Sequence, residues 1–261
     1  MWVEDLRRDG FAVVRNVLSL AEHTRLRRQA LDELLRLPNM NHSDTLWEIR
    51  TLPQIRSLFE EWWGSTDLIS GFDGLTVRRR GSPEYLAIDW HVDQDHTHEP
   101  GSCCVQALVA LADSTAESGT IEFVRTSHQA HQDLVWRLCD PEDAEVDGTE
   151  GAWEFVPIPS SDPVLRGEIL RPVVRAGDVV LWDARTAHRV CPPTGDAPRL
   201  VAYVCHVPRS FADAVTLEQR RRFFEEAVAT THWPHRLVDR GDVRGVARRL
   251  SDAPSAVRAL V

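Results

Sequence analysis

The spacing of apolar residues changes about a quarter of the way along this chain of 261 residues. Up to about residue 70, apolar positions mostly recur every three or four residues, which predicts helices that pack by one face. Ser19 and Glu22 form a capping-box pair at the start of one such helix. The apolar stripe of this helix consists of the leucines at positions 20, 26, 31, 34 and 35. We therefore expect a helical first part.

Two shorter features interrupt or extend this helical part. Residues 11–16, Phe-Ala-Val-Val-Arg-Asn, predict a short strand. Thr51 and Gln54 repeat the capping pattern and predict a short helix that ends near Gly64.

From about residue 75 the apolar residues gather in short runs rich in Val, Leu and Ile, separated by Gly, Pro and Asp. Such runs predict strands. Their spacing is uneven and no helical patterns alternate with them, which disfavours a parallel doubly wound sheet and favours an antiparallel sandwich or jelly roll. The predicted strands are residues 75–79, 85–91, 103–111, 120–124, 169–174, 179–182 and 200–207.

This pattern predicts a single domain over residues 1–261, mainly β with flanking helices. A helical part spans residues 1–70, a β core about 71–210, and a helical tail 211–261, whose first helix Thr216 and Gln219 would cap. Residues 138–165 interrupt the core with many acidic residues and several prolines. We interpret them as a surface insertion, either a lid over the site or a plain solvated loop.

Composition narrows the classes of function. A formal net charge of −10 gives no basic surface, so neither nucleic acid nor an anionic membrane is expected as a partner. No apolar run is long enough to span a bilayer, and the first residues lack an apolar signal region. Five cysteines without a Cys-x-x-Cys pair disfavour a disulfide scaffold and predict a reducing cytoplasm.

Three residues suggest a metal centre. His91 and Asp93 are two apart at the end of a predicted strand, so their side chains point to the same face. His188 follows 95 residues later, and a late strand of a jelly roll can lie beside an earlier one. Two imidazoles and one carboxylate suit Fe(II) and leave part of its coordination sphere open, although Zn(II) accepts the same ligands.

Two polar residues on predicted strands are candidates for binding a second ligand. Arg199 opens the strand after His188, and its planar guanidinium can hold a carboxylate through two hydrogen bonds. Gln106 lies in an apolar strand, where its amide needs a partner if it is buried. It would serve either to bind a co-substrate or to brace a neighbouring strand.

With their flanking sequence, these residues resemble the phytanoyl-CoA dioxygenase family of Fe(II)/2-oxoglutarate oxygenases. The resemblance extends from Asp9-Gly10-Phe11, through the Gly177-Asp178 turn and the strand 179–182, to the strand after Arg199. It implies a double-stranded β-helix, a cupin-like jelly roll, with His91, Asp93 and His188 as iron ligands. It further implies that Arg199 binds the distal carboxylate of 2-oxoglutarate.

The same resemblance implies the reaction. Fe(II), 2-oxoglutarate and O₂ would oxidise an aliphatic C–H bond of a small molecule, with release of succinate and CO₂. Related halogenases lack the carboxylate ligand, so Asp93 favours hydroxylation, with desaturation, epoxidation and ring closure as other outcomes. Family members often carry a hydroxyl residue two positions after the second histidine. Val190 stands there, so a co-substrate contact must come from elsewhere.

The substrate is not specified by any motif. A small molecule of secondary metabolism is expected from the breadth of the family, and the residues that could contact it are Asp89, Trp90, Gln94 and Trp182. Two other functions remain open. A metal-dependent hydrolase would use the same ligands with Asp89 or Asp95 as general base. A non-catalytic cupin-like binding protein would keep the barrel without the reaction.

Overall fold

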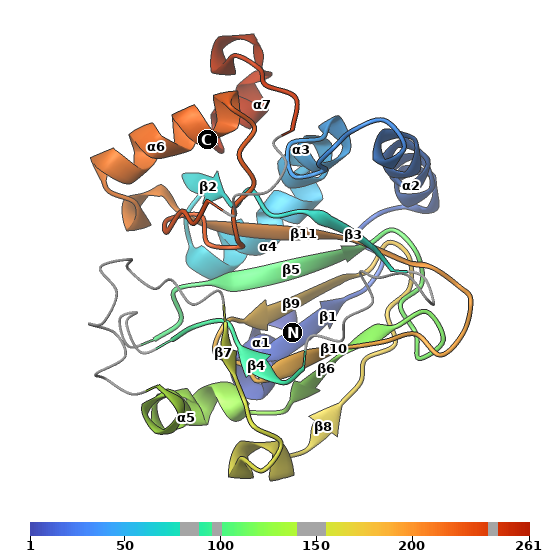
Figure 1. Cartoon of the computed structure of the whole chain (residues 1–261), viewed down its shortest axis with the longest axis vertical. Helices are drawn as coiled ribbons and strands as arrows, with labels where there is room; N and C mark the ends of the chain where they lie inside the picture. The colour runs from blue at the N-terminus through green and yellow to red at the C-terminus, as the bar shows by residue number, and fades with distance from the viewer. Residues whose placement is uncertain (79–88, 96–100, 140–154, 240–244) are drawn as a thin grey trace.

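A computed structural model describes residues 1–78, 89–95, 101–139, 155–239 and 245–261. Two antiparallel sheets face each other, and most helices pack on the outer side of the larger one (Figure 1). This arrangement is the jelly roll that the short, unevenly spaced strands predict.

The larger sheet has six strands. Its order is β1 (Phe11–Val14), β9 (Val179–Asp183), β5 (Val105–Ala110), β11 (Arg199–Pro208) and β2 (Leu68–Ser70), with β3 (Leu75–Arg78) also paired to β11.

The smaller sheet has five strands, and two of them carry the histidines of the predicted metal centre. Its order is β7 (Val156–Pro157), β4 (His91–Val92), β10 (His188–Cys191), β6 (Thr120–Val124) and β8 (Ile169–Leu170).

Helices come before and after the strands in the sequence. They are α1 (Trp2–Asp9), α2 (Leu20–Leu34), α3 (Asp44–Thr51), α4 (Pro53–Trp63), α5 (His131–Leu138), α6 (Ala214–Glu225) and α7 (Ser255–Arg258). Within the described residues, none of the helices is long and apolar enough to cross a membrane.

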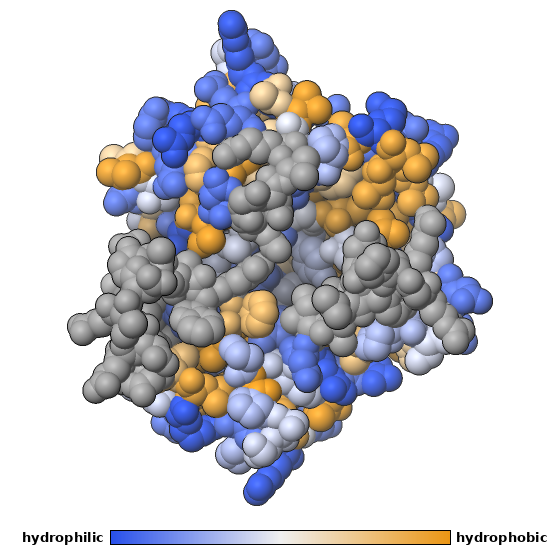
Figure 2. All heavy atoms as spheres, viewed as in Figure 1, coloured by the Kyte–Doolittle hydropathy of each residue, from blue (hydrophilic) through white to orange (hydrophobic). Residues whose placement is uncertain are grey.

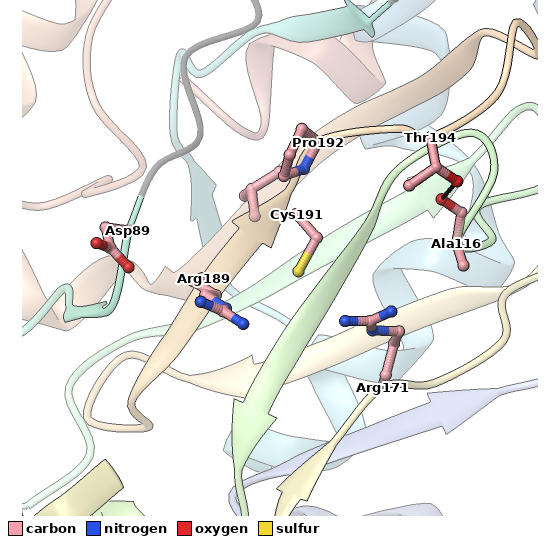
Figure 3. A pocket seen from close by; sticks show the side chains of 8 residues that line it. Asp89, Ala116, Arg171, Arg189, Cys191, Pro192 and Thr194 are labelled. Carbon is pink, nitrogen blue, oxygen red and sulfur yellow. Dashed lines mark hydrogen bonds between the residues drawn. The ribbon is translucent and has the colours of Figure 1, made fainter. Parts of the chain in front are cut away.

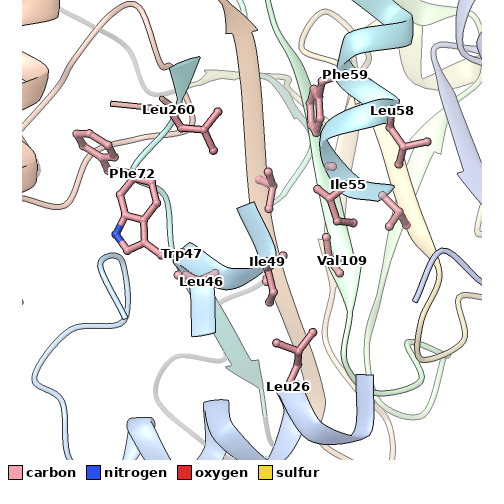
Figure 4. Close-up of a cluster of buried hydrophobic side chains, with 14 of the residues drawn as sticks. Leu26, Leu46, Trp47, Ile49, Ile55, Leu58, Phe59, Phe72, Val109 and Leu260 are labelled. Atoms are coloured by element: carbon pink, nitrogen blue, oxygen red, sulfur yellow. The ribbon is translucent and has the colours of Figure 1, made fainter. Parts of the chain in front are cut away.

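The larger sheet separates two apolar layers because its side chains alternate between faces. Its outer face packs against the helices, as Val109 of β5 does against Ile55 and Phe59 of α4 (Figure 4). Its inner face, including Trp182 and Val201, joins residues of the smaller sheet in a second cluster. Polar residues on the inner face therefore lie between the two sheets.

Several local expectations were right. Ser19 accepts a hydrogen bond from the backbone of Glu22, whose side chain returns to Ser19, which is the predicted capping box. The second predicted helix ends at Gly64, which adopts a left-handed conformation with φ of 63°.

Other capping predictions were wrong. Thr51 is the last residue of α3, where its hydroxyl donates back to Trp47, and α4 begins with Pro53 after Leu52. At α6 the cap is Asp213, whose carboxylate accepts from the backbone of Thr216. The capping patterns thus located helix starts within a few residues but misassigned the capping residue.

Strand boundaries shifted most around the predicted metal ligands. His188, expected just after a strand, opens β10, and β2 and β7 were not predicted. Of the predicted strand 85–91, only residues 89–91 are described, and β4 begins at His91. Most of the acidic insertion, residues 140–154, lies outside the described residues, but β7, at its described end, pairs with β4.

Candidate metal centre

The two histidines lie directly opposite each other on neighbouring strands. His91 of β4 and His188 of β10 form a register pair, and Asp93 follows β4 by one residue. The Nε2 atom of His91 is 3.6 Å from Asp93 Oδ1, and that of His188 is 3.4 Å from Asp93 Oδ2. All three side chains are buried, and their ligating atoms lie within 4.8 Å of one another.

Backbone carbonyls set the orientation of both imidazole rings. His91 Nδ1 lies 2.7 Å from the carbonyl oxygen of Asp89, and His188 Nδ1 lies 2.9 Å from that of Thr186. A carbonyl oxygen only accepts, so Nδ1 carries the proton in each ring and Nε2 keeps its lone pair. Both lone pairs are therefore available to a metal, and the rings are fixed in the way typical of metal-binding histidines.

Two side chains of the larger sheet hold the carboxylate of Asp93. The amide of Gln106 and, at 3.4 Å, the indole N–H of Trp182 both donate to Asp93 Oδ2. Gln106 on β5 and Trp182 on β9 are themselves a register pair. The Asp93 backbone also donates to the carbonyl oxygen of Ala184 at 2.9 Å. The carboxylate is thus held against the sheet by strand positions fixed in the fold.

The protonation states suit a cation. Burial lowers the pKa of His188 to about 4, with a further contribution from the charge of His91, so His188 is neutral at pH 7. Burial alone would raise the pKa of Asp93. The neighbouring histidines, His188 foremost, and the hydrogen bond from Gln106 outweigh burial and lower it, so the carboxylate is ionised.

The donor set therefore fits a metal of the Fe(II) type. Neutral imidazole nitrogens and one carboxylate are the ligands of the iron centres that keep positions open for oxygen chemistry. Within the described residues, these three form the group of His, Cys, Asp and Glu side chains close enough to share an ion.

Arg199 is fully buried between the sheets. Its Nε donates to the hydroxyl of Ser114 at 3.3 Å, and its Nη1 and Nη2 to the hydroxyl of Tyr203 at 3.4 and 3.5 Å. Within the described residues, the side-chain partners of Arg199 are hydroxyls and include no carboxylate. By contrast, buried Arg220 donates to the backbone carbonyls of Ser70, Pro234 and Leu260 and to a main-chain oxygen of Val261. A buried guanidinium with hydroxyl partners alone is suited to receive an anionic ligand.

Aromatic rings connect Arg199 to the metal ligands. The Trp182 ring lies 5.6 Å from the ring of His188 and 6.5 Å from that of Tyr203, which contacts Arg199. Trp182 and Tyr203 are on the inner face of the larger sheet. The candidate metal site and the buried Arg199 therefore lie in the same interior between the two sheets.

Gln94 and Trp90, expected as substrate contacts, have structural partners instead. Gln94 donates to the carbonyl oxygen of Gly101 at 2.9 Å and accepts from the thiol of Cys103, so its amide braces the loop after Asp93. Trp90 packs with Val92 and Leu134 in a cluster against α5, and the guanidinium of Arg189 covers its ring.

Asp89 is exposed, and its carboxylate accepts from the backbone of Trp90 at 2.8 Å. It lines a pocket of about 430 Å³ beside β10, together with Arg171, Arg189 and Cys191 (Figure 3). Arg189 and Cys191 alternate with His188 along β10 and so point away from the metal centre. The expected position of Asp89 in the interior was wrong for this reason.

Comparison with known proteins agrees with this geometry. The family model described as phytanoyl-CoA dioxygenase (PhyH) matches residues 38–201, more than half of the chain. The chain belongs to this family. The match contains all three metal-ligand candidates and Arg199, and ends before the last helices.

A curated relative is the Ava biosynthesis cluster protein O of Aspergillus versicolor. It is 29% identical over 204 residues, which are 76% of this chain and 65% of the relative. The chain therefore spans slightly less than two thirds of that protein's length.

Two solved structures show the same fold. One is the epimerase SnoN in complex with Fe³⁺, alpha ketoglutarate and nogalamycin RO, with 23% identity and a TM-score of 0.62 over 79% of this chain and 82% of that one. The other is the alpha ketoglutarate-dependent carbocyclase SnoK from nogalamycin biosynthesis, with 21% identity and a TM-score of 0.55 over 78% and 82%.

Sequence reasoning gave no role to several residues of the site. Ser114 and Tyr203 contact Arg199, and the carbonyl of Thr186 orients His188. The alternation of β11 indicated that Tyr203 shares a face with Arg199, but its hydroxyl contact depends on how the strand is placed. Contacts of backbone carbonyls cannot be predicted from residue types, because every residue has the same carbonyl group.

Proposed function

We propose that this protein is a non-haem Fe(II)- and 2-oxoglutarate-dependent oxygenase. His91, Asp93 and His188 would hold the iron, and Arg199 would bind the distal carboxylate of 2-oxoglutarate. The observation that carries the proposal is the buried His-Asp-His cluster, which shares an interior with a buried arginine whose side-chain partners among the described residues are hydroxyls. Membership of the phytanoyl-CoA dioxygenase family supports it.

The residues of this chain would prepare the site in three ways. Gln106 and Trp182 hold the Asp93 carboxylate in one orientation, and the carbonyls of Asp89 and Thr186 keep both histidines in the metal-binding tautomer. Tyr203 would supply a hydroxyl contact to the co-substrate beside Arg199, which Val190 cannot. Bound iron and 2-oxoglutarate would supply the oxidising chemistry that the protein itself lacks.

We further propose that the reaction is hydroxylation of a C–H bond in a small molecule of secondary metabolism. The carboxylate ligand Asp93 supports hydroxylation over halogenation. The relative named for a biosynthesis cluster supports the substrate class. Because an epimerase and a carbocyclase share this fold, other oxidative reactions are the alternatives to hydroxylation. Succinate release and product mass with candidate small molecules would decide among them.

Among the described residues, neither carboxylate considered as the general base of a hydrolase joins the cluster of metal-ligand candidates. Asp89 lies on the outer side of β10's sheet, and Asp95 forms an ion pair at 3.9 Å with Arg236. A hydrolase would also have no use for the buried guanidinium of Arg199.

Anaerobic titration of the metal-free protein with Fe(II) and then 2-oxoglutarate tests the proposal. We expect a weak visible charge-transfer band, which requires both ligands on one site, and we expect it to be absent in Asp93→Ala. Iron binding without this band would contradict the proposal and favour the hydrolase or a non-catalytic binding protein.

Replacement of Arg199 separates the co-substrate site from the metal site. Arg199→Ala should raise the 2-oxoglutarate concentration for half-saturation at least about 10-fold, the effect of losing a charge-assisted hydrogen bond of roughly 1.5–3 kcal/mol. Iron content should stay unchanged. The exposed Arg175, paired with Asp113, provides the control Arg175→Ala. An unchanged 2-oxoglutarate requirement in Arg199→Ala would place the carboxylate site elsewhere.

A further inference from the structure

Residues 230–236, Thr-Thr-His-Trp-Pro-His-Arg, form a buried segment without helix or strand. Thr230, Thr231, His232 and Trp233 are each less than 7% exposed. The segment follows α6 and lies outside the part of the chain that the family model matches. Buried irregular backbone must satisfy its polar groups through specific partners. The partners of this segment therefore indicate what positions it.

Four contacts attach the segment to the barrel. Thr230 exchanges hydrogen bonds of 3.3 Å with the backbone of Phe72, and Arg220 donates to the carbonyl oxygen of Pro234 at 2.6 Å. Arg236 pairs at 3.9 Å with the buried carboxylate of Asp95, two residues beyond Asp93. A Cβ atom at Gly71 would lie 2.8 Å from the carbonyl oxygen of His232, so only glycine allows the segment to approach so closely there.

Trp233 packs on the inner face of the larger sheet, at the end that carries Gln106, the residue that holds the Asp93 carboxylate. Its cluster includes Cys104, Ala184 and Cys205. The carbonyl of Ala184 accepts from the backbone of Asp93, and Cys205 is the register partner of Gln106. The segment, part of the orange-red chain beside β2 and β11 in Figure 1, therefore continues the wall of the metal centre.

His232 lies close to the metal ligands without being one of them. Its neighbour Trp233 packs with Ala184, whose carbonyl accepts from the backbone of Asp93, and the ring centroids of His232 and Trp233 lie 4.9 Å apart. The cluster whose ligating atoms fall within 4.8 Å comprises His91, Asp93 and His188, and among the described residues His232 does not join it. The buried imidazole of His232 therefore belongs to the wall beside the ligands rather than to the ligand set.

We propose that the segment 230–236 forms one wall of the substrate site and that His232 orients the substrate beside the metal. The inference rests on the proposed oxygenase function. An imidazole both donates and accepts hydrogen bonds, so it would take a hydroxyl or carbonyl oxygen next to the carbon that reacts. Trp233 would support the imidazole from behind, since their rings lie 4.9 Å apart.

The segment also lies apart from the metal centre in the comparison with the family. The metal ligands and Arg199 lie within the family match, whereas His232 lies outside it. The parts that handle iron and co-substrate would be shared, and the wall that recognises the substrate would be particular to this chain. An oxygenase can change its substrate in this way without altering its metal centre.

Oxidation directed by the bound metal maps the wall without a known substrate. The protein is loaded with Fe(II) alone and treated with ascorbate and hydrogen peroxide, and peptide mass spectrometry locates gains of one oxygen. We expect oxidation of His91, of His188 and of the segment 230–236. The oxidised fraction of each should be at least about 10-fold higher than that of the distant His23 on α2. Marks on the two ligands without any on the segment would overturn the proposal. No marks on the ligands would instead contradict the metal centre itself.

Replacement of His232 tests its hydrogen-bonding role. Nitric oxide, a probe for the position where O₂ would bind, is added to the anaerobic Fe(II)–2-oxoglutarate protein, and the electron paramagnetic resonance spectrum is recorded. His232→Phe should change the line shape, His232→Gln should restore it in part, and His23→Gln should leave it unchanged. The affinities for Fe(II) and 2-oxoglutarate should stay within about 3-fold in all three variants. Identical spectra for wild type and His232→Phe would overturn the role of His232.

Discussion

A small number of side chains holds the candidate ligands in the orientation that can bind a metal ion. Gln106 is the clearest case, because its amide donates to the carboxylate of Asp93. The sequence left two uses open for Gln106, a co-substrate contact or a brace between strands. The structure places it as a brace of a metal-ligand candidate, which is a more specific role than either.

Gln106→Leu should weaken Fe(II) binding about 10- to 100-fold, the usual effect of removing a group that orients a metal ligand. Leucine keeps the volume but leaves the buried Oδ2 of Asp93 with the longer bond from Trp182 alone. Isothermal titration with Fe(II) measures the change. The matched control is Gln129→Leu, since Gln129 is exposed and donates only to the backbone of Arg8. Equal Fe(II) affinities in Gln106→Leu and wild type would show that Trp182 alone is sufficient to hold the Asp93 carboxylate.

At the scale of elements, the corner between α1 and β1 supports the loop that carries His188. Gly10 adopts φ of 86°, and its carbonyl accepts from Thr186 Oγ1 at 2.8 Å and from the backbone of Asp183 at 3.0 Å. The carbonyl of Thr186 in turn orients His188. The first helix therefore affects the metal centre although no residue of it reaches the metal.

Gly10→Ala should destabilise the fold and weaken metal binding together. A Cβ there would meet Thr186 Oγ1 at 2.6 Å and His128 Nδ1 at 2.7 Å. We expect a loss of about 1–3 kcal/mol from left-handed backbone strain and steric contact, measured by urea unfolding. Gly64→Ala is the control, because its φ is also positive but a Cβ would meet nothing within 4 Å. It should cost about 1 kcal/mol without changing metal affinity. A Gly10→Ala protein with unchanged iron affinity would contradict the link to His188.

For the molecule as a whole, two buried histidines on the helical side of the larger sheet make stability depend on pH. Burial, followed by the charge of Arg50, lowers the pKa of both His42 and His206 to about 3. In the unfolded chain both would titrate near 6.5. Below that pH the unfolded state therefore takes up protons that the folded state does not, and this stability is lost as the pH falls from about 6.5 towards 3.

We expect the free energy of unfolding to fall by about 4 kcal/mol between pH 7.5 and 5.0 from these two groups together. Urea unfolding at several pH values measures it. His206→Leu should reduce the fall by about 2 kcal/mol, the share of one such group, whereas His23→Leu, at a partly exposed position on α2, should not change it. A stability that is flat across this range would mean that the two rings are protonated in the folded state.

The face drawn in Figure 2 carries both hydrophilic and apolar side chains, with an apolar patch toward its upper right and hydrophilic side chains prevailing at its upper and lower ends. The two proposed binding functions, at the metal candidates and at Arg199, lie between the sheets.

Local sequence was sufficient wherever a function depends on alternation along one strand. The pairing of His91 with Asp93 on one face, and of Arg199 with Tyr203, follows from the two-residue repeat of a strand. The same rule failed for Asp89, because residues 89 and 90 precede β4 and the repeat applies only within a regular strand. It also missed β10, whose four residues are too short and polar to stand out.

By itself the sequence determined the jelly roll, the identity of the three candidate ligands and the arginine, because each depends on residue type and on spacing within a strand or turn. Only the tertiary structure decided what touches what across strands. It brought His91 opposite His188, turned Gln106 toward Asp93, gave Trp90 and Gln94 partners outside the candidate ligand set, and packed Trp233 with Ala184 and Cys205. The physical reason is that register and loop closure join residues of different strands and loops, and such contacts are fixed by the packing of the whole fold rather than by any local pattern.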